Sequence, residues 1–249
     1  MKLLLDLGNS RLKWATENQG KMSACEILDY RRPEFIAQIR QQWHVLAIPE
    51  IVAISSVAER EVLAELLQLI KYFWPQIKCI VPQSEAFAFG VQNAYPQPHT
   101  LGIDRWLALI AAHAFYPGDV CVADCGTAIT LDAIQADGLH LGGVIAPGLM
   151  LMKRALAGQT AALEFNLQPG SAAMAQETAL GIANGVLWAA AGLISQTLQH
   201  LPTKFQLIMT GGDADKIRQV ISIPVSVDEV LVLKGLSVYA QSHLAHHSI

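Results

Sequence analysis

The stretch DLGNSRLKW, residues 6–14, decides how this chain folds. Three leucines lead into Asp6, and a Gly-Asn-Ser turn follows before a strand-like pattern resumes. A buried strand that ends on a carboxylate and a tight turn predicts a β-hairpin with exposed backbone N–H groups at its tip. Such a tip can hold phosphate oxygens, while the carboxylate holds a hydrated Mg²⁺ beside them and Lys13 neutralises charge. A single copy is explained equally well as an ordinary hairpin.

Two further segments change that balance. DCGTAIT, residues 124–130, repeats the acid-x-glycine pattern at the end of a second apolar strand and adds the hydroxyls of Thr127 and Thr130. TGGDA, residues 210–214, ends a third strand on two glycines that lead into a helix and would let a flat adenosine approach the backbone. Each segment alone is unspecific. The ordered set of three predicts a nucleotide site clamped by two hairpins.

Composition excludes several other classes of protein. Of the 249 residues, 52 % are hydrophobic and 15 % charged, which excludes a disordered chain and favours buried sheets and helices. A net charge of −4 gives no electrostatic reason to expect nucleic-acid binding. The four cysteines make no metal-type pattern, which favours free thiols in the cytoplasm. The longest apolar stretch, residues 179–194, contains Asn184 and predicts a buried helix, with no membrane partner.

The pattern of strands and helices divides the chain into two halves near residue 117. Each half opens with apolar strands, the first of which ends in an acid and a glycine, and then alternates helices and strands. We therefore expect domains at 1–116 and 117–249, packed across a cleft. Within them, residues 21–28 are predicted as one strand, and residues 59–73 and about 229–244 as helices.

The segment LGIDRW, residues 101–106, carries chemistry that a nucleotide site alone does not need. Asp104 and Arg105 open a predicted helix, where a carboxylate is an ordinary complement to the helix dipole. A kinase, however, needs a carboxylate that orients the acceptor hydroxyl and takes its proton. It also needs a cation when its substrate is an acid, and arginine suits a bidentate grip on a carboxylate.

Taken together, these segments resemble a known family. The two hairpins and the later Gly-Gly turn are similar to those of the acetate and sugar kinase, heat-shock ATPase and actin superfamily. Within it, the chain closely resembles the type III pantothenate kinases. The resemblance spans nearly the whole chain in order and rests on six segments: DLGNSRLK (6–13), AYP…LGIDRW (94–106), DCGTAIT (124–130), GGVIAPG (142–148), ETALGIANG (177–185) and TGGDA (210–214).

The resemblance implies an α/β fold. It consists of two duplicated ribonuclease-H-like domains with mixed β-sheets flanked by helices, and the active site lies in the interdomain cleft. It also implies ATP, Mg²⁺ and a monovalent cation, K⁺ or NH₄⁺, as cofactors, and a homodimer whose substrate pocket lies near the interface. Asp6 is implied as the Mg²⁺ residue, through water, and Asp124 as the residue associated with the monovalent cation.

Residue roles follow from the same resemblance. Asp104 is implied as the catalytic base. ATP binding is implied for Asp6, Leu7, Gly8, Asn9, Ser10, Arg11, Leu12, Lys13, Thr127, Gly211 and Gly212. Pantothenate binding is implied for Tyr95, Gly102, Ile103, Asp104, Arg105 and Thr178. From the residues alone, Tyr95 is also explained as a loop tyrosine half-packed on the surface, and Thr178 equally well as an N-cap.

The predicted function is the ATP-dependent phosphorylation of pantothenate to 4′-phosphopantothenate, the first step of coenzyme A biosynthesis. One alternative is a kinase of the same superfamily that acts on another small hydroxylated or carboxylate substrate. Another is a non-catalytic regulatory accessory factor. The presence of Asp104 and of both hairpins argues against the regulatory alternative.

Overall fold

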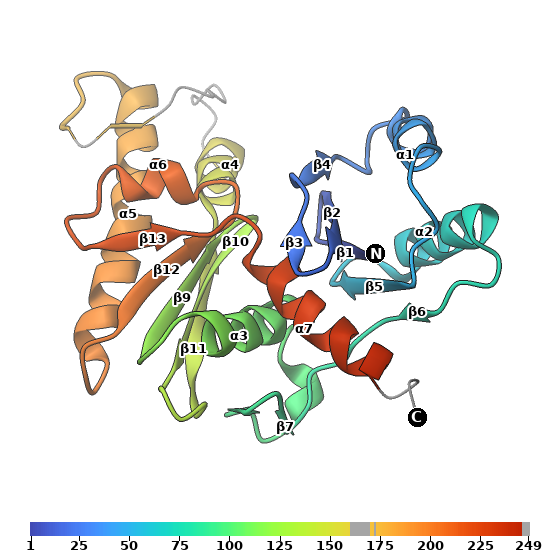
Figure 1. Ribbon diagram of the computed structural model, residues 1–249. Coiled ribbons are helices and arrows are strands. Elements are labelled where there is room, and N and C mark those ends of the chain that lie inside the picture. The colour runs from blue at the N-terminus through green and yellow to red at the C-terminus, as the bar shows by residue number, and fades with distance from the viewer. Residues whose placement is uncertain (160–169, 172, 246–249) are drawn as a thin grey trace. The chain divides into compact units, whose positions relative to one another are not determined.

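The computed structural model describes residues 1–159, 170–171 and 173–245 (Figure 1). Its contacts divide the chain into two compact units. The first contains Met1–Ala114 together with the described chain from Val230 onward, and the second contains Phe115–Glu229. Each unit is an α/β fold with its own sheet and its own hydrophobic core.

The first unit is built on a mixed sheet with the strand order β3-β2-β1-β5-β6, and β4 also pairs with β2. Its strands are β1 (Lys2–Leu7), β2 (Leu12–Asn18), β3 (Lys21–Met22), β4 (Glu26–Leu28), β5 (Ile51–Ser56) and β6 (Cys79–Ile80). β1 pairs antiparallel with β2 and parallel with β5. Because side chains alternate along a strand, Leu3, Leu5 and Leu7 enter one core, whereas Asp6 points to the opposite face.

The helices of this unit pack on the sheet or on one another. They are α1 (Phe35–Trp43), α2 (Arg60–Phe73), α3 (Ile103–Phe115) and α7 (Leu231–Ala245). α1 and α2 bury apolar side chains against β1, and the Trp43 ring packs edge-on against Trp14 with a centroid separation of 6.3 Å. A small hairpin, β7 (Phe87–Ala88) and β8 (Val91–Gln92), and a short 3₁₀ turn (Pro98–Thr100) precede α3.

The second unit repeats this sheet plan. Its order is β11-β10-β9-β12-β13, formed by β9 (Val120–Cys125), β10 (Ala128–Ile134), β11 (His140–Pro147), β12 (Gln206–Thr210) and β13 (Val225–Val227). β9 pairs antiparallel with β10 and parallel with β12, as β1 does with β2 and β5. The first strand, the hairpin and the parallel neighbour therefore occupy the same places in both sheets, as the predicted duplication requires.

The helices of the second unit are α4 (Leu149–Gln159), α5 (Thr178–His200) and α6 (Ala214–Arg218). α5 is long and apolar enough to cross a membrane by length and composition, and about two fifths of its most apolar stretch is buried inside the protein. Its side chains Val186, Leu187, Ala190 and Ile194 enter the core of the unit beside β9 and β10. One face of the helix therefore belongs to the core, so the predicted burial of this stretch is met in part.

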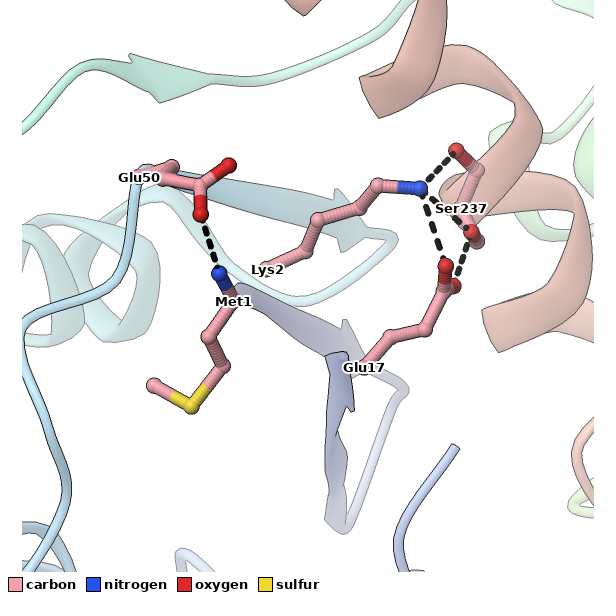
Figure 2. Close-up of polar contacts among 5 residues, drawn as sticks. All are labelled: Met1, Lys2, Glu17, Glu50 and Ser237. Carbon is pink, nitrogen blue, oxygen red and sulfur yellow. Dashed lines mark hydrogen bonds and ion pairs between the residues drawn. The ribbon is translucent and has the colours of Figure 1, made fainter. Parts of the chain in front are cut away.

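The C-terminal helix requires a correction to the predicted boundaries. The prediction placed residues 117–249 together, but α7 packs against β1 and β5 of the first unit. A buried cluster holds it there (Figure 2): Lys2 Nζ lies 3.0 Å from Glu17 Oε1 and 3.1 Å from Ser237 Oγ, and Ser237 Oγ also donates to Glu17. Because all three groups are buried, their separation would leave a charge unpaired, so α7 stays with this sheet.

The segment 21–28 also differs from its prediction as one strand. It forms two short strands, β3 and β4, which pair with opposite ends of β2. Between them Ser23 leaves the ladder: its N–H donates to Thr16 O, and its hydroxyl accepts a hydrogen bond from Thr16 N. Local hydroxyl–backbone bonds of this kind compete with strand pairing, and the alternation of apolar residues does not reveal them.

Candidate active site

The hairpin of the first unit carries the predicted ATP-binding segment. Asp6 is paired with Lys13 across the β1–β2 ladder, and the Gly8 N–H donates to Arg11 O at 3.0 Å to close the turn. Tyr30 supports the turn from outside, since its hydroxyl donates to Gly8 O at 3.0 Å. Asn9 and Arg11 are exposed at the tip. The structure thus brings a carboxylate and an ammonium group to the same end of the sheet.

Two of the residues predicted to bind ATP have side chains buried in the core of the first unit. Leu7 and Leu12 are both 0 % exposed and belong to the apolar core of the unit, so their side chains pack inside it and face no ligand. The turn also does not need a glycine at position 8, because a Cβ there would lie 3.5 Å from Arg11 O, an ordinary contact.

Ser55 adds a group that the sequence pattern missed. It is the parallel partner of Asp6 in β5, so that both side chains lie on the same face of the sheet. The Ser55 hydroxyl is buried and has no hydrogen-bond partner among the residues that the structure describes. A buried hydroxyl without a partner is costly, so its presence beside a carboxylate fits a site that takes a hydrated cation or a phosphate.

The segment LGIDRW forms the start of α3, as predicted. The Asp104 carboxylate accepts the Arg105 N–H at 2.8 Å, and the Arg105 guanidinium donates from Nη1 to the Tyr95 hydroxyl at 3.0 Å. Arg105 is buried. A Cβ on Gly102 would lie 2.7 Å from Asp104 Oδ1, so the glycine makes room for the carboxylate. Asp104, Arg105 and Tyr95 are therefore linked, and Tyr95 is half-buried with its hydroxyl bonded to Arg105.

The hairpin of the second unit has the same construction. Asp124 is paired with Thr130 of β10 and with Thr210 of β12, and Thr127 is exposed at the tip. The tip is held by two other loops: Gly148 N donates to Thr127 O at 3.0 Å, and Asp213 N donates to Cys125 O at 2.9 Å. The three segments DCGTAIT, GGVIAPG and TGGDA therefore converge at one end of this sheet.

Gly211 is the glycine that this arrangement requires. Its φ is +91°, and a Cβ there would lie 2.5 Å from Asp124 Oδ1 and from two backbone atoms of Cys125. Gly212 follows it in the turn between β12 and α6. The backbone of β12 thus passes directly against the carboxylate predicted to hold a cation, an approach that only glycine permits.

Two lysines near this turn were also missed by the sequence analysis. Lys216 lies on α6, and its Nζ is 2.6 Å from Asp213 Oδ1. The pKa of Lys153 on α4 is lowered chiefly by burial and further by the charge of Lys216. The charge of Asp213 acts in the opposite direction on Lys153, so the two lysines and this carboxylate form one charged group. Burial raises the pKa of the Cys125 thiol to about 12, so this thiol is not a nucleophile at neutral pH.

Thr178 lies at the start of α5, where Glu177 is the N-cap, so that the N-cap alternative for Thr178 is wrong. Its side chain is exposed and lines an apolar groove of about 1160 Å³ between α4 and α5, together with Leu151, Leu156 and Ile182.

The donor set fits the predicted cations in kind. In the described part of the chain, no three His, Cys, Asp or Glu side chains gather as a metal site. Mg²⁺ usually keeps several waters and is bound by one or two carboxylates and the substrate phosphates. A single carboxylate at each strand end, Asp6 and Asp124, is therefore compatible with cations that bind together with the nucleotide.

Comparison with solved structures identifies the fold. The chain matches a provisionally assigned 2-dehydro-3-deoxygalactonokinase of Sinorhizobium meliloti at 13 % identity and a TM-score of 0.61, covering 97 % of this chain and 96 % of that one. It matches a Campylobacter jejuni protein, provisionally assigned to the Baf family of transcriptional activators, at 24 % identity and a TM-score of 0.62, covering 98 % and 99 %. At these identities the likenesses show the fold alone. The α/β fold, with mixed sheets flanked by helices, is shared with a provisionally assigned sugar-acid kinase, as the predicted fold class requires.

The family follows from the sequence matches. The model of the type III pantothenate kinases matches residues 2–200. The type III pantothenate kinase of Nitrosococcus oceani is 34 % identical over 253 aligned positions, which cover 95 % of this chain and 92 % of that protein. The chain belongs to the type III pantothenate kinase family. The predicted activity, ATP-dependent phosphorylation of pantothenate in coenzyme A biosynthesis, is thereby confirmed at the level of the family.

Proposed function

We propose that this chain phosphorylates pantothenate with Asp104 as the catalytic base and Arg105 as the residue that holds the substrate carboxylate. The observation that carries this assignment is the geometry at the start of α3. The Asp104 carboxylate is oriented by the Arg105 N–H, while the Arg105 guanidinium is oriented by the Tyr95 hydroxyl. A substrate with a hydroxyl and a carboxylate needs an acid–base group and a cation that are fixed relative to one another.

ATP is assigned to the two hairpins and the Gly211 turn. Backbone N–H groups at the two hairpin turns would donate to phosphate oxygens, apart from those of Gly8 and Gly126, which bond within the turns, and Lys13 adds charge at the first tip. The γ-phosphoryl group passes through a transition state with little covalent participation by the protein, so positioning and charge compensation supply most of the catalysis. The side chains at these tips that solvent reaches are those of Asn9, Ser10, Arg11 and Thr127.

The cations are assigned to the two strand-end carboxylates. Asp6 would hold Mg²⁺ through water, with the buried Ser55 hydroxyl beside it as a further polar group. Asp124 would hold the monovalent cation, next to the Gly211 backbone. The cations supply charge compensation for the phosphates when they are bound. The protein residues fix where that charge lies relative to the hairpin tips.

Self-association and location are part of the same proposal. The apolar groove between α4 and α5 and the exposed side chains Met150, Leu151, Leu156 and Trp188 around it form a surface that fits a second copy of the chain. The enzyme would then act as a cytoplasmic homodimer, with Thr178 of the groove close to the interface. Sedimentation of Leu156→Asp against the wild type tests this, and an unchanged sedimentation coefficient would contradict it.

The experiment for the base assignment compares wild type with Asp104→Asn in an assay that couples ADP release to pantothenate. Asn keeps the size of the side chain and an acceptor for the Arg105 N–H but cannot take a proton. We expect kcat to fall by roughly 10²–10⁴-fold with a smaller change in KM. Asp137→Asn, an exposed turn residue in the second unit, serves as the matched control. A fully active Asp104→Asn enzyme would show that Asp104 is not the catalytic base.

A further inference from the structure

The loop between β6 and α3 is closed on itself by buried hydrogen bonds. At its neck the Ser84 hydroxyl donates to Leu101 O at 2.8 Å, directly before the segment that carries Asp104 and Arg105. The β7–β8 hairpin within the loop rests on two helices: the Phe89 ring lies 5.3 Å from the Tyr239 ring of α7, and Gly90, with φ +79°, packs against His113 of α3. The loop is thus an ordered part of the first unit.

Asn93 is the central polar group of this loop. It is 9 % exposed, and each end of its side-chain amide is used. Its Oδ1 accepts the Tyr95 N–H at 3.0 Å, and its Nδ2 donates to Glu85 O at 3.1 Å and to Pro98 O at 3.4 Å. A single side chain therefore joins the base of the hairpin, the backbone of Tyr95 and the 3₁₀ turn.

These bonds continue to the proposed substrate cation. Asn93 fixes the Tyr95 backbone, and the Tyr95 hydroxyl accepts from Arg105 Nη1 at 3.0 Å. The guanidinium carbon also lies over the Tyr95 ring, 5.6 Å from its centre, so the ring contacts the cation as well. An arginine has many rotamers, and fixing one of them before the substrate arrives lowers the entropic cost of binding.

We infer that Asn93 is a positioning residue for substrate recognition: it holds Tyr95 so that Tyr95 holds the Arg105 guanidinium ready for the carboxylate of the substrate. The inference rests on the proposed roles of Tyr95 and Arg105. It assigns no contact with the substrate to Asn93 itself. Its distinctive consequence is that Asn93 governs selectivity for an acidic substrate while leaving the nucleotide and the acid–base chemistry alone.

The test is Asn93→Ala, assayed with pantothenate and with its alcohol analogue, pantothenyl alcohol, in which a hydroxymethyl group replaces the carboxylate. We expect the KM for pantothenate to rise roughly ten-fold, the effect of one or two lost hydrogen bonds. The KM for ATP should stay within about two-fold, as should kcat, because neither depends on the Arg105 grip. The preference for pantothenate over the alcohol, expressed as a ratio of kcat/KM values, should fall by a similar factor.

Thr100→Ala is the matched control, because Thr100 also makes a side-chain hydrogen bond within this loop, from its Oγ1 to Gln97 O at 2.7 Å, but none to Tyr95. It should leave the KM and the preference unchanged. If Asn93→Ala keeps the wild-type preference, Asn93 is only a structural residue and the inference is wrong. The same conclusion follows if the variant has a lower kcat, a higher KM for both substrates and a lower thermal stability.

Arg105→Ala separates the two levels of the proposal. If Arg105→Ala loses the preference for pantothenate and Asn93→Ala does not, only the role of Asn93 is refuted. If Arg105→Ala itself keeps the wild-type KM and preference, the proposed role of Arg105 is wrong and the inference falls with it. If both variants lose the preference and Thr100→Ala retains it, the inference is supported.

Discussion

Replacement of Gly211 by alanine tests the convergence of loops in the second unit. Gly211 has φ +91°, and an added Cβ would lie 2.5 Å from Asp124 Oδ1, from Cys125 C and from Cys125 O. Two of these three atoms are backbone. They cannot move unless the β9–β10 hairpin moves, and Asp213 N holds that hairpin through its bond to Cys125 O at 2.9 Å.

The magnitude follows from two separate costs. Holding an alanine in left-handed backbone costs about 1–2 kcal/mol. Forcing a methyl group into a filled space costs typically 1–3 kcal/mol more, because neighbours leave their preferred positions. We therefore expect the free energy of unfolding to fall by about 3 kcal/mol. The KM for ATP should rise because Asp124 and the hairpin tip at Thr127 are displaced, whereas the KM for pantothenate should change little.

Urea unfolding and steady-state kinetics measure these effects. Gly192→Ala is the matched control: it lies in α5, is exposed, and a Cβ there meets nothing within 4 Å. That variant should gain about 0.5–1 kcal/mol, since alanine favours a helix interior over glycine. A Gly211→Ala protein with wild-type unfolding and wild-type KM for ATP would show that Gly211 does not approach Asp124 as described.

Three other outcomes are expected. In the first unit, Gly235→Ala would place a Cβ 1.9 Å from Leu107 O, so urea unfolding should show a loss of at least about 2 kcal/mol; an unchanged midpoint would contradict the packing of α7 on α3. Burial raises the pKa of Cys121 from 9.0 to about 12, so the neutral thiol stabilises the fold below pH 9 and this stabilisation is lost as the pH rises toward 12. Raising the pH from 8 to 11 should therefore lower the free energy of unfolding of wild type by about 2–3 kcal/mol more than that of Cys121→Val. Equal decreases in the two proteins would refute the buried thiol. Replacing K⁺ by choline should lower kcat/KM for ATP in wild type but not in Asp124→Asn; equal sensitivity of both proteins would place the cation elsewhere.

Parts of the candidate site could be read from the sequence because they depend on short stretches of chain. Asp6 and Asp124 each follow an apolar strand and precede a turn, and that order alone places a carboxylate at a strand end. Asp104 and Arg105 open α3 as predicted. The same pattern could not show that the side chains of Leu7 and Leu12 point into the core, because an ATP-binding hairpin and an ordinary buried hairpin have the same pattern of apolar and polar residues.

Other parts depend on groups that are distant in the sequence. Ser55 lies beside Asp6 because β5 pairs with β1, and nothing within residues 51–57 indicates that this strand pairs with β1. Asn93 acquires its role from two backbone carbonyls and one N–H of the folded loop, and an asparagine between two strand-like runs is otherwise an ordinary turn residue.

The sequence by itself therefore determined the strands that end in carboxylates, the duplicated plan and the family, because local alternation and short motifs carry that information. Only the tertiary structure decided that the last helix belongs to the first unit. That decision rests on Lys2, Glu17 and Ser237, the last of which is 235 positions from Lys2. Burial makes their pairing obligatory, and burial is a property of the folded chain that no local pattern contains.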